Sequence, residues 1–282
     1  MILFKKADDI RVYLIKLKEQ GNKLGFIPTM GALHAGHISL LNLANENGFV
    51  SVCSIFVNPT QFNDSKDFDK YPVTIEKDID LLEKAGCAVL FIPDTTEIYP
   101  NGFSNSEKYE LGYLENILEG KFRPGHFQGV CMVVHRLLTI IPCNQLFIGQ
   151  KDYQQCMVIK KLVELKKINT GIMIGPTLRE ADGLAMSSRN VRLMETDRKQ
   201  ATKIFEKLSF IKNNIKPGDL NKLKQRAVME LTDHGFKVDY IEIANAGNLD
   251  VVNQWDGDLK LVAVAAAFLG EVRLIDNLFL EE

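Results

Sequence analysis

The sequence predicts an α/β fold, with a Rossmann-like parallel sheet in a nucleotide-binding domain and a smaller C-terminal α+β domain. The first observation is that short apolar runs alternate with amphipathic helical patterns over residues 1–176, which is the order of βαβ units. The second is that the pattern changes after Asn190, where two helices precede a set of strands. We therefore expect one domain over 1–176 and a second domain over 177–282.

Five apolar runs of the first domain have the length of buried strands, and helical patterns precede or separate them. In chain order, the expected elements are a helix at 8–20, a strand at 24–28, a helix at 38–47, a strand at 49–56, a helix at 74–85, a strand at 88–92, a helix at 126–140, a strand at 145–148, a helix at 152–165 and a strand at 171–174. Loops follow the strand ends at 57–71, 93–110, 149–151 and 176–190. Ligands of open parallel sheets gather at the carboxyl ends of strands, so we expect these loops to converge on one site.

The second domain is expected to begin with two amphipathic helices, at 196–213 and 220–233. A Lys-Pro-Gly-Asp turn separates them, and its Asp219 is suited to cap the second helix. Strand-like runs follow at 237–243, 260–268 and 272–277. Helices followed by strands indicate an α+β arrangement.

Composition narrows the class of partner. The 282-residue chain has a formal net charge of −2, so it lacks the excess positive charge that is typical of nucleic-acid-binding proteins. Its five cysteines form no C-x-x-C pair, which is typical of buried thiols in a reducing compartment. The first residues show no signal-peptide pattern, and the apolar run at 261–269 is too short to span a bilayer. We expect a cytoplasmic protein that acts on small molecules, with no nucleic-acid or membrane partner.

The segment Thr29-Met30-Gly31-Ala32-Leu33-His34-Ala35-Gly36-His37 lies where the first strand should turn into a helix. A helix N-terminus offers backbone N–H groups and a partial positive charge to an anion. The two histidines add movable donors, and the glycines let the backbone approach a ligand closely. The segment therefore predicts a phosphate site. A His-x-x-His pair could instead bind a metal, but no third ligand stands at a suitable spacing, and a structural pair would explain only one histidine.

Two further loops of the first domain carry polar side chains. Gln61 can donate to one substrate oxygen and accept from another, although Asn58-Pro59 just before it is also an ordinary turn signal. Arg123 could clamp a carboxylate or phosphate, or could simply hold a neighbouring loop. His126, near the expected helix start, is more often structural.

The last strands of the first domain lead into two more polar segments. Gly149 and Lys151 lie between the end of an expected strand and the start of an expected helix, a second position suited to binding phosphate. Asp152 could cap that helix or bond a ribose hydroxyl, and Gln155 should face back toward the strand ends. The segment 178–190 ends in two hydroxyls and a guanidinium that could follow phosphate oxygens, or it could be a plain interdomain linker.

Together these segments resemble the pantoate–β-alanine ligase family, whose members share the H-x-G-H motif of nucleotidyltransferases and class I aminoacyl-tRNA synthetases. The resemblance covers nearly the whole chain and rests on five blocks in order, at 28–37, 56–62, 123–130, 151–155 and 179–190. Any one block could occur by accident, whereas all five in order are very specific.

The resemblance implies a reaction in two steps. A pantoate carboxylate attacks the α-phosphorus of ATP, which gives pantoyl adenylate and pyrophosphate. The amine of β-alanine then attacks the acyl carbon and expels AMP, which leaves pantothenate. Because a carboxylate resists nucleophiles, the adenylate supplies the leaving group, and the protein's task is positioning and neutralising phosphate charge.

The resemblance also implies that the domain at 1–176 binds ATP and pantoate and that the α+β domain at 177–282 acts as a lid. It implies roles for single residues as well. His34 and His37 would hold the phosphates, with His37 the proton donor. Gln61 and Gln155 would bind pantoate, with Gln61 also at the β-alanine site. Mg²⁺ would bridge the ATP phosphates, with Asp78 as its side-chain ligand. The implied catalytic residues are His34, His37, Lys151, Ser187, Ser188 and Arg189. The implied ATP contacts are Met30, Gly31, Ala32, Leu33, His34, Ala35, Gly36, His37, Gly149, Gln150, Lys151, Asp152, Leu178, Met186, Ser187, Ser188 and Arg189.

Two departures from the family pattern bear on the site: Val73 replaces a usual arginine, and Gln150 replaces a usual glutamate. Neither removes a residue with an implied chemical role. The alternatives are a nucleotidyltransferase that keeps the nucleotide on its product, and a nucleotide-binding regulatory module without catalysis. The family resemblance further implies a homodimer.

Overall fold

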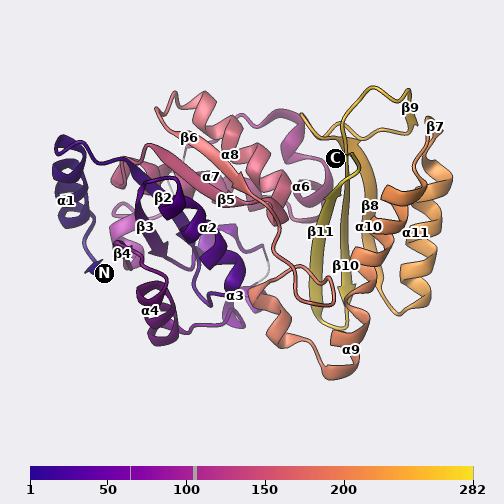
Figure 1. Ribbon diagram of the computed structural model, residues 1–282, viewed down its shortest axis with the longest axis horizontal. Helices are drawn as coiled ribbons and strands as arrows, with labels where there is room; N and C mark the ends of the chain where they lie inside the picture. The colour runs from indigo at the N-terminus through magenta and orange to yellow at the C-terminus, as the bar shows by residue number, and fades with distance from the viewer. Residues whose placement is uncertain (64, 104–106, 282) are drawn as a thin grey trace. The chain divides into compact units, whose positions relative to one another are not determined.

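The computed structural model describes residues 1–63, 65–103 and 107–281, and the chain divides into two compact units (Figure 1). The first unit comprises Met1–Gln150 and Gln155–Pro176, and the second comprises Lys151–Gln154 and Thr177–Glu282. Lys151–Gln154 thus groups with the second unit, whereas the sequence placed it in the first domain.

The first unit is built on a six-stranded, wholly parallel sheet with the order β1-β4-β3-β2-β5-β6. Its strands are β1 Ile2–Phe4, β2 Leu24–Thr29, β3 Val50–Ile55, β4 Val89–Phe91, β5 Gln145–Gly149 and β6 Gly171–Gly175. The chain leaves β2 toward β3 on one side and leaves β5 toward β6 on the other. The strand order therefore reverses between β2 and β5, and the carboxyl ends of two such strands are where sheets of this kind bind ligands.

The helices of this unit follow the predicted alternation. They are α1 Ala7–Glu19, α2 Ala35–Glu46, α3 Ser65–Asp69, α4 Ile75–Lys84, α5 Thr95–Ile98, α6 Leu118–Phe122, α7 His126–Ile140 and α8 Tyr153–Leu165, with short 3₁₀ turns η1 Pro59–Gln61, η2 Gly112–Glu115 and η3 Gln150–Asp152. The α2 helix begins three residues before the predicted start. Short helices also lie in the predicted loops 57–71 and 93–110, of which residues 64 and 104–106 are outside the described residues.

The sequence of β2 is a continuous apolar run because nearly the whole strand is buried. Leu24, Phe26 and Ile27 are fully buried, because the strand lies in the middle of a sheet whose side chains are covered on both faces. On one face Ile27 shares a core with Leu41 of α2 and Leu90 of β4. The histidine turn thus starts from a rigid strand.

All five cysteines are free and buried, as the sequence predicted. Burial raises the pKa of the Cys131 thiol to about 12 and that of Cys143 to about 11. Thiols that stay protonated at neutral pH are poor nucleophiles, so neither of these two is suited to catalysis.

The second unit is built on the three-stranded antiparallel sheet β11-β10-β8. Its elements are η4 Ser188–Arg192, α9 Glu195–Gln200, α10 Lys203–Asn214, β7 Gly218–Asp219, α11 Asn221–Asp233, β8 Lys237–Asn245, β9 Gln254–Trp255, β10 Leu261–Leu269 and β11 Val272–Phe279. The predicted helix at 196–213 is divided into α9 and α10. The Thr202 hydroxyl bonds the Lys199 carbonyl, the acceptor that a continuous helix would offer to the Lys203 N–H. The predicted fold class is confirmed.

Among the described residues, no helix is both long and apolar enough to cross a membrane.

Candidate active site

The turn between β2 and α2 has an unusual backbone. Gly31 and Ala32 both have positive φ, at 85° and 48°, and only glycine adopts this conformation without cost. A Cβ at Gly31 would also lie 3.1 Å from Oδ2 of Asp78. The glycine is therefore required by the turn itself, and Ala32 stays in a strained conformation that its surroundings must hold.

Asp78 holds this turn from the neighbouring helix α4. Its side chain is 1% exposed, and its two oxygens accept the backbone N–H groups of Ala32 at 2.9 Å and Leu33 at 2.8 Å. The Thr74 hydroxyl donates to the same carboxylate at 3.1 Å. The described residues contain no group of three metal-ligating side chains. The geometry thus gives Asp78 a positioning role in this turn.

His34 and His37 cap the start of α2 and each other. Nδ1 of His34, the N-cap residue, accepts the Gly36 N–H at 3.1 Å, and Nδ1 of His37 accepts the His34 N–H at 3.3 Å. The ring centroids are 4.1 Å apart. Because each Nδ1 accepts a hydrogen bond, each neutral ring carries its proton on Nε2. Both histidines therefore carry their donor on the nitrogen farther from the backbone.

This arrangement changes how the turn could bind an anion. The sequence predicted a cradle of backbone N–H groups, but Ala32, Leu33, His34 and Gly36 all donate within the protein. These four backbone N–H groups therefore do not form the predicted cradle, and the Nε2–H groups of the two imidazoles are side-chain donors of the turn.

The structure brings Gln61 together with Met30. The Gln61 amide donates to the Met30 sulfur at 3.0 Å, and its oxygen accepts from Asn58 at 3.1 Å. Asn58, at the start of η1, is only 1% exposed, and its own oxygen accepts the Tyr99 hydroxyl at 2.8 Å. Tyr99 is a supporting residue that no local sequence pattern indicated, because 41 positions separate it from Asn58. The amide expected to bind pantoate is thus held at the end of β2.

Helix α7 holds η1 from the other side. His126 hydrogen-bonds the Gln61 carbonyl through Nδ1 at 2.8 Å, so Nδ1 is the donor, and Nε2 lies 3.2 Å from Arg123. Arg123 also reaches Asn63 at 3.4 Å. Of the two interpretations of Arg123, the contacts support the one in which it holds a neighbouring loop. A Cβ at Gly129 would overlap the Thr60 carbonyl, so only glycine allows α7 to approach η1 this closely.

The carboxyl end of β5 lies beside that of β2, on the other side of the point where the strand order reverses. Gly149 is the last residue of this strand, which lies next to β2 in the sheet, and Gln150 follows it. Gln155, in α8, is half-buried, and its side-chain amide has no hydrogen-bond partner among the described residues. Its amide is therefore available to a ligand.

The remaining candidate residues belong to the second unit. Residues 178–186 form a hairpin rather than a plain linker, since Arg179 pairs with Ala185 and the Met186 N–H bonds the Leu178 carbonyl at 3.0 Å. Ser187 follows as the N-cap of η4, and its hydroxyl accepts the Arg189 N–H at 3.3 Å. The segment with the predicted phosphate donors is thus ordered.

Two arginines fix this hairpin. Arg198 bonds Asp182 and Glu180 at 2.6 Å each, which holds the pKa of Asp182 below its ordinary value. Arg179 bonds both oxygens of Asp276 in β11, at 2.6 and 3.0 Å. Burial raises the pKa of Asp276 above its ordinary value, and the guanidinium of Arg179 opposes that shift.

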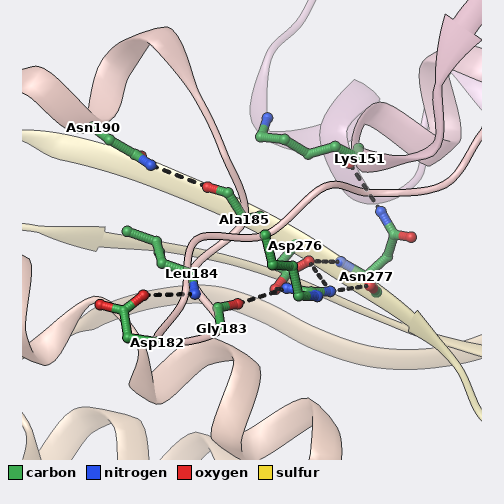
Figure 2. Close-up of polar contacts among 9 residues, drawn as sticks. Lys151, Asp182, Gly183, Leu184, Ala185, Asn190, Asp276 and Asn277 are labelled. Atoms are coloured by element: carbon green, nitrogen blue, oxygen red, sulfur yellow. Dashed lines mark hydrogen bonds and ion pairs between the residues drawn. The ribbon is translucent and has the colours of Figure 1, made fainter. Parts of the chain in front are cut away.

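Lys151 is attached to the same strand. Its carbonyl accepts the side-chain N–H of Asn277 at 2.9 Å, as Figure 2 shows, and its ammonium lies 3.7 Å from Asp152. Sequence patterns did not indicate Asp276 or Asn277, because a polar pair at the end of a strand has many ordinary structural uses.

The predicted site residues therefore fall into two sets. In the first unit are Met30, Gly31, Ala32, Leu33, His34, Ala35, Gly36, His37, Gln61, Asp78, Gly149, Gln150 and Gln155; in the second are Lys151, Asp152, Leu178, Met186, Ser187, Ser188 and Arg189.

A parallel sheet with a His-x-x-His turn at the point where its strand order reverses defines an α/β enzyme of the nucleotide-binding class. A family model described as pantoate-beta-alanine ligase matches residues 2–279. The chain belongs to the pantoate–β-alanine ligase family.

Individual relatives agree with this assignment. Pantothenate synthetases of Cytophaga hutchinsonii and Aquifex aeolicus are each 42% identical to the chain. The match covers 99% of both sequences for the Cytophaga protein and 98% of both for the Aquifex protein. The crystal structure of pantothenate synthetase from Thermus thermophilus superposes with a TM-score of 0.90 at 35% identity, with all of both chains covered. That of the Francisella tularensis ligase, complexed with "Beta-gamma ATP" and β-alanine, has a TM-score of 0.83 at 40% identity, covering 100% of this chain and 98% of that one.

Proposed function

We propose that the chain joins pantoate to β-alanine through a pantoyl-adenylate intermediate. The observation that carries this proposal is the reciprocal capping of His34 and His37, which leaves the ring proton of each on Nε2 at the end of β2. Two such donors, both at the N-terminus of α2, suit a triphosphate on which negative charge develops. The Francisella relative, complexed with "Beta-gamma ATP" and β-alanine, supports these two small molecules as ligands here.

In the first step a pantoate carboxylate oxygen attacks the α-phosphorus of ATP. The bond between the α-phosphorus and the bridging oxygen breaks, and pyrophosphate leaves with that electron pair. His37 Nε2–H would donate to the phosphate as charge builds, and His34 would hold the neighbouring oxygens. Lys151, Ser187, Ser188 and Arg189 would neutralise the remaining charge.

In the second step the neutral amine of β-alanine attacks the acyl carbon of pantoyl adenylate. AMP leaves, and the new amide loses one proton. Gln61 and Gln155 would hold pantoate through both steps, Gln61 reaching the β-alanine site as well, because an amide can satisfy a hydroxyl and a carboxylate together. Gln61 is oriented for this by Asn58 and by the Met30 sulfur.

Magnesium remains a prediction, and the protein side chains do not fit a dedicated site for it. Asp78 is buried and accepts two backbone N–H groups, and no other cluster of ligands occurs in the described part of the chain. Mg²⁺ is therefore expected to arrive on the triphosphate, as it commonly does in ATP-dependent enzymes.

The proposal is tested by pyrophosphate release with ATP and pantoate, with and without β-alanine. A ligase of this mechanism releases one pyrophosphate per site without β-alanine and turns over, with free AMP, when β-alanine is present. A nucleotidyltransferase would turn over without β-alanine and keep the nucleotide on its product, and a regulatory module would release no pyrophosphate. The expected homodimer and the expected cytoplasmic location are separate proposals, the first of which light scattering tests.

A further inference from the structure

The last two polar residues of β11 hold two segments that carry proposed phosphate-binding groups. Asp276 and Asn277 are adjacent, 5% and 2% exposed respectively, in the edge strand of the antiparallel sheet. Asp276 binds Arg179 in the hairpin that leads to Ser187–Arg189, and Asn277 binds the Lys151 carbonyl. Figure 2 shows Asn277 beside Asp276 and pointing to the Lys151 backbone.

The contacts of Arg179 exceed those of a simple ion pair. Besides Asp276, its guanidinium donates to the Gly183 carbonyl at 3.1 Å and to the Asn277 carbonyl at 3.2 Å. It also stacks on the Phe205 ring, with 3.9 Å from Cζ to the ring centroid. All of these contacts require the planar fork of arginine in one orientation. The hairpin is therefore fixed to β11 in a single register.

A buried ion pair is a poor way to gain stability. Removing both charges from water offsets much of their attraction, and a well-packed apolar pair is often as stable. What the pair provides is a defined geometry, because each hydrogen bond specifies a direction. The Asn277 N–H also donates to Oδ1 of Asp276 at 2.7 Å, which couples the orientations of the two residues.

We propose that Arg179, Asp276 and Asn277 are positioning residues for adenylate formation, which hold Lys151 and the Ser187–Arg189 segment in fixed register with each other. This inference rests on the proposed function, in which both segments act on the triphosphate. The three residues touch no reacting atom themselves. Their loss should therefore slow the step in which phosphate charge develops and spare the step in which the amine attacks the acyl carbon.

The test compares two half-reactions in Asn277→Ala and in Asp276→Asn. We expect the single-turnover rate of pyrophosphate release, at saturating ATP and pantoate, to fall roughly tenfold or more, because small misplacements of charge-stabilising groups have effects of this size. Acyl transfer from supplied pantoyl adenylate to β-alanine should stay within about twofold of the unmodified rate. Asp276→Asn and Arg179→Gln remove the same interaction, the Arg179–Asp276 pair. The double variant should therefore lose no more of the pyrophosphate-release rate than the single variant with the larger loss.

The chain provides a matched control in the same sheet. Arg273 of β11 binds Asp239 of β8 at 2.8 Å, with side chains 16% and 11% exposed, and neither residue touches the two segments in the contacts described. Asp239→Asn should lower the unfolding temperature about as much as Asp276→Asn does, but it should leave the rates of both half-reactions unchanged. If Asp276→Asn does not fold, Asn277→Ala keeps the ion pair and carries the test alone.

Different failures have different meanings. Equal losses in both half-reactions, or an equal loss in Asp239→Asn, would overturn the inference and make the three residues purely structural. Normal pyrophosphate release by Asn277→Ala, with a slow Lys151→Ala, would overturn the inference and leave the proposed function intact. Normal release by both Lys151→Ala and Arg189→Ala would instead overturn the residue roles in the proposed function.

Discussion

Each histidine of the β2–α2 turn divides two tasks between its two nitrogen atoms. Nδ1 accepts a backbone N–H and fixes the ring, so Nε2 keeps the proton that would be donated to phosphate in the proposed mechanism. The sequence indicated that His34 and His37 belong to a phosphate site. It could not indicate the tautomer, because that depends on backbone hydrogen bonds that form only in the folded turn.

This division of tasks can be tested at His37 with two amide substitutions. In His37→Asn the amide oxygen can replace Nδ1 but nothing reaches the position of Nε2, whereas in His37→Gln an N–H group can extend toward it. We expect His37→Asn to slow single-turnover pyrophosphate release roughly a hundredfold or more, about 3 kcal/mol, and His37→Gln to retain part of the rate. An unchanged rate in His37→Asn would show that Nε2 does not act on the phosphate.

Gln155 is the second residue with a separable role. We expect Gln155→Ala to raise the KM for pantoate and leave the ATP constant nearly unchanged, because the lost amide leaves a buried substrate group unpaired at about 1–3 kcal/mol. Steady-state kinetics with each substrate varied in turn provides the measurement. A higher ATP constant with normal pantoate use would place Gln155 in the nucleotide site.

At the scale of elements, helix α4 fixes the turn between β2 and α2 through one buried carboxylate. In Asp78→Asn one oxygen becomes an N–H group facing a backbone donor, so the unfolding free energy should fall by about 1–3 kcal/mol and adenylate formation should slow. The Mg²⁺ concentration for half-maximal rate should stay the same. Chemical denaturation and a Mg²⁺ titration measure the two effects.

Asp80 on the same helix is the matched control for Asp78. It is 59% exposed and pairs only with Lys84 in the contacts described, and such surface pairs contribute about 0–1 kcal/mol. Asp80→Asn should therefore change neither stability nor rate appreciably. If Asp78→Asn kept full stability and needed far more Mg²⁺, Asp78 would be a metal ligand after all.

The sequence predicted those elements whose burial is continuous. The strands β2, β3 and β5 lie within one residue of the predicted runs, because central parallel strands must be apolar throughout. The edge strand β6 is only partly buried, and it also lies within one residue of its predicted run. The sequence missed β1, whose three half-exposed residues become a strand only by pairing with Val89–Phe91. It also missed the hairpin at 178–186, because its polar residues find their partners at Asp276 and at Arg198, far along the chain.

The same reasoning explains which site residues could be found. His34, His37 and Gln61 stand next to local signals, a strand end or a turn, that mark them in the sequence. Tyr99, Asp276 and Asn277 support the site through contacts between distant segments. Local sequence patterns contain no information on such pairings.

At the scale of the whole molecule, the proposed catalytic groups are shared between two compact units. His34 and His37 belong to the first unit, and Lys151 and Ser187–Arg189 to the second. We therefore expect ATP and pantoate to affect residues of both units. Exclusion of water from the reacting atoms matters, because free pantoyl adenylate would hydrolyse.

Hydrogen exchange tests this expectation. The amides of residues 183–190 should exchange more slowly with ATP, Mg²⁺ and pantoate present than without them. The helix α11, far along the chain from this segment, should exchange equally in both states and serves as an internal control. Equal exchange of 183–190 in both states, together with normal adenylation by Arg189→Ala, would mean that the segment takes no part in triphosphate binding.

The central claim, a pantoyl-adenylate intermediate, is tested most directly by following oxygen. Pantoate labelled with ¹⁸O in both carboxylate oxygens is converted with ATP and β-alanine, and the products are analysed by mass spectrometry. Because the attacking oxygen stays on phosphorus when the amine displaces AMP, we predict one ¹⁸O atom in each AMP and one in each pantothenate. AMP without label, or label in pyrophosphate or phosphate, would contradict the mechanism.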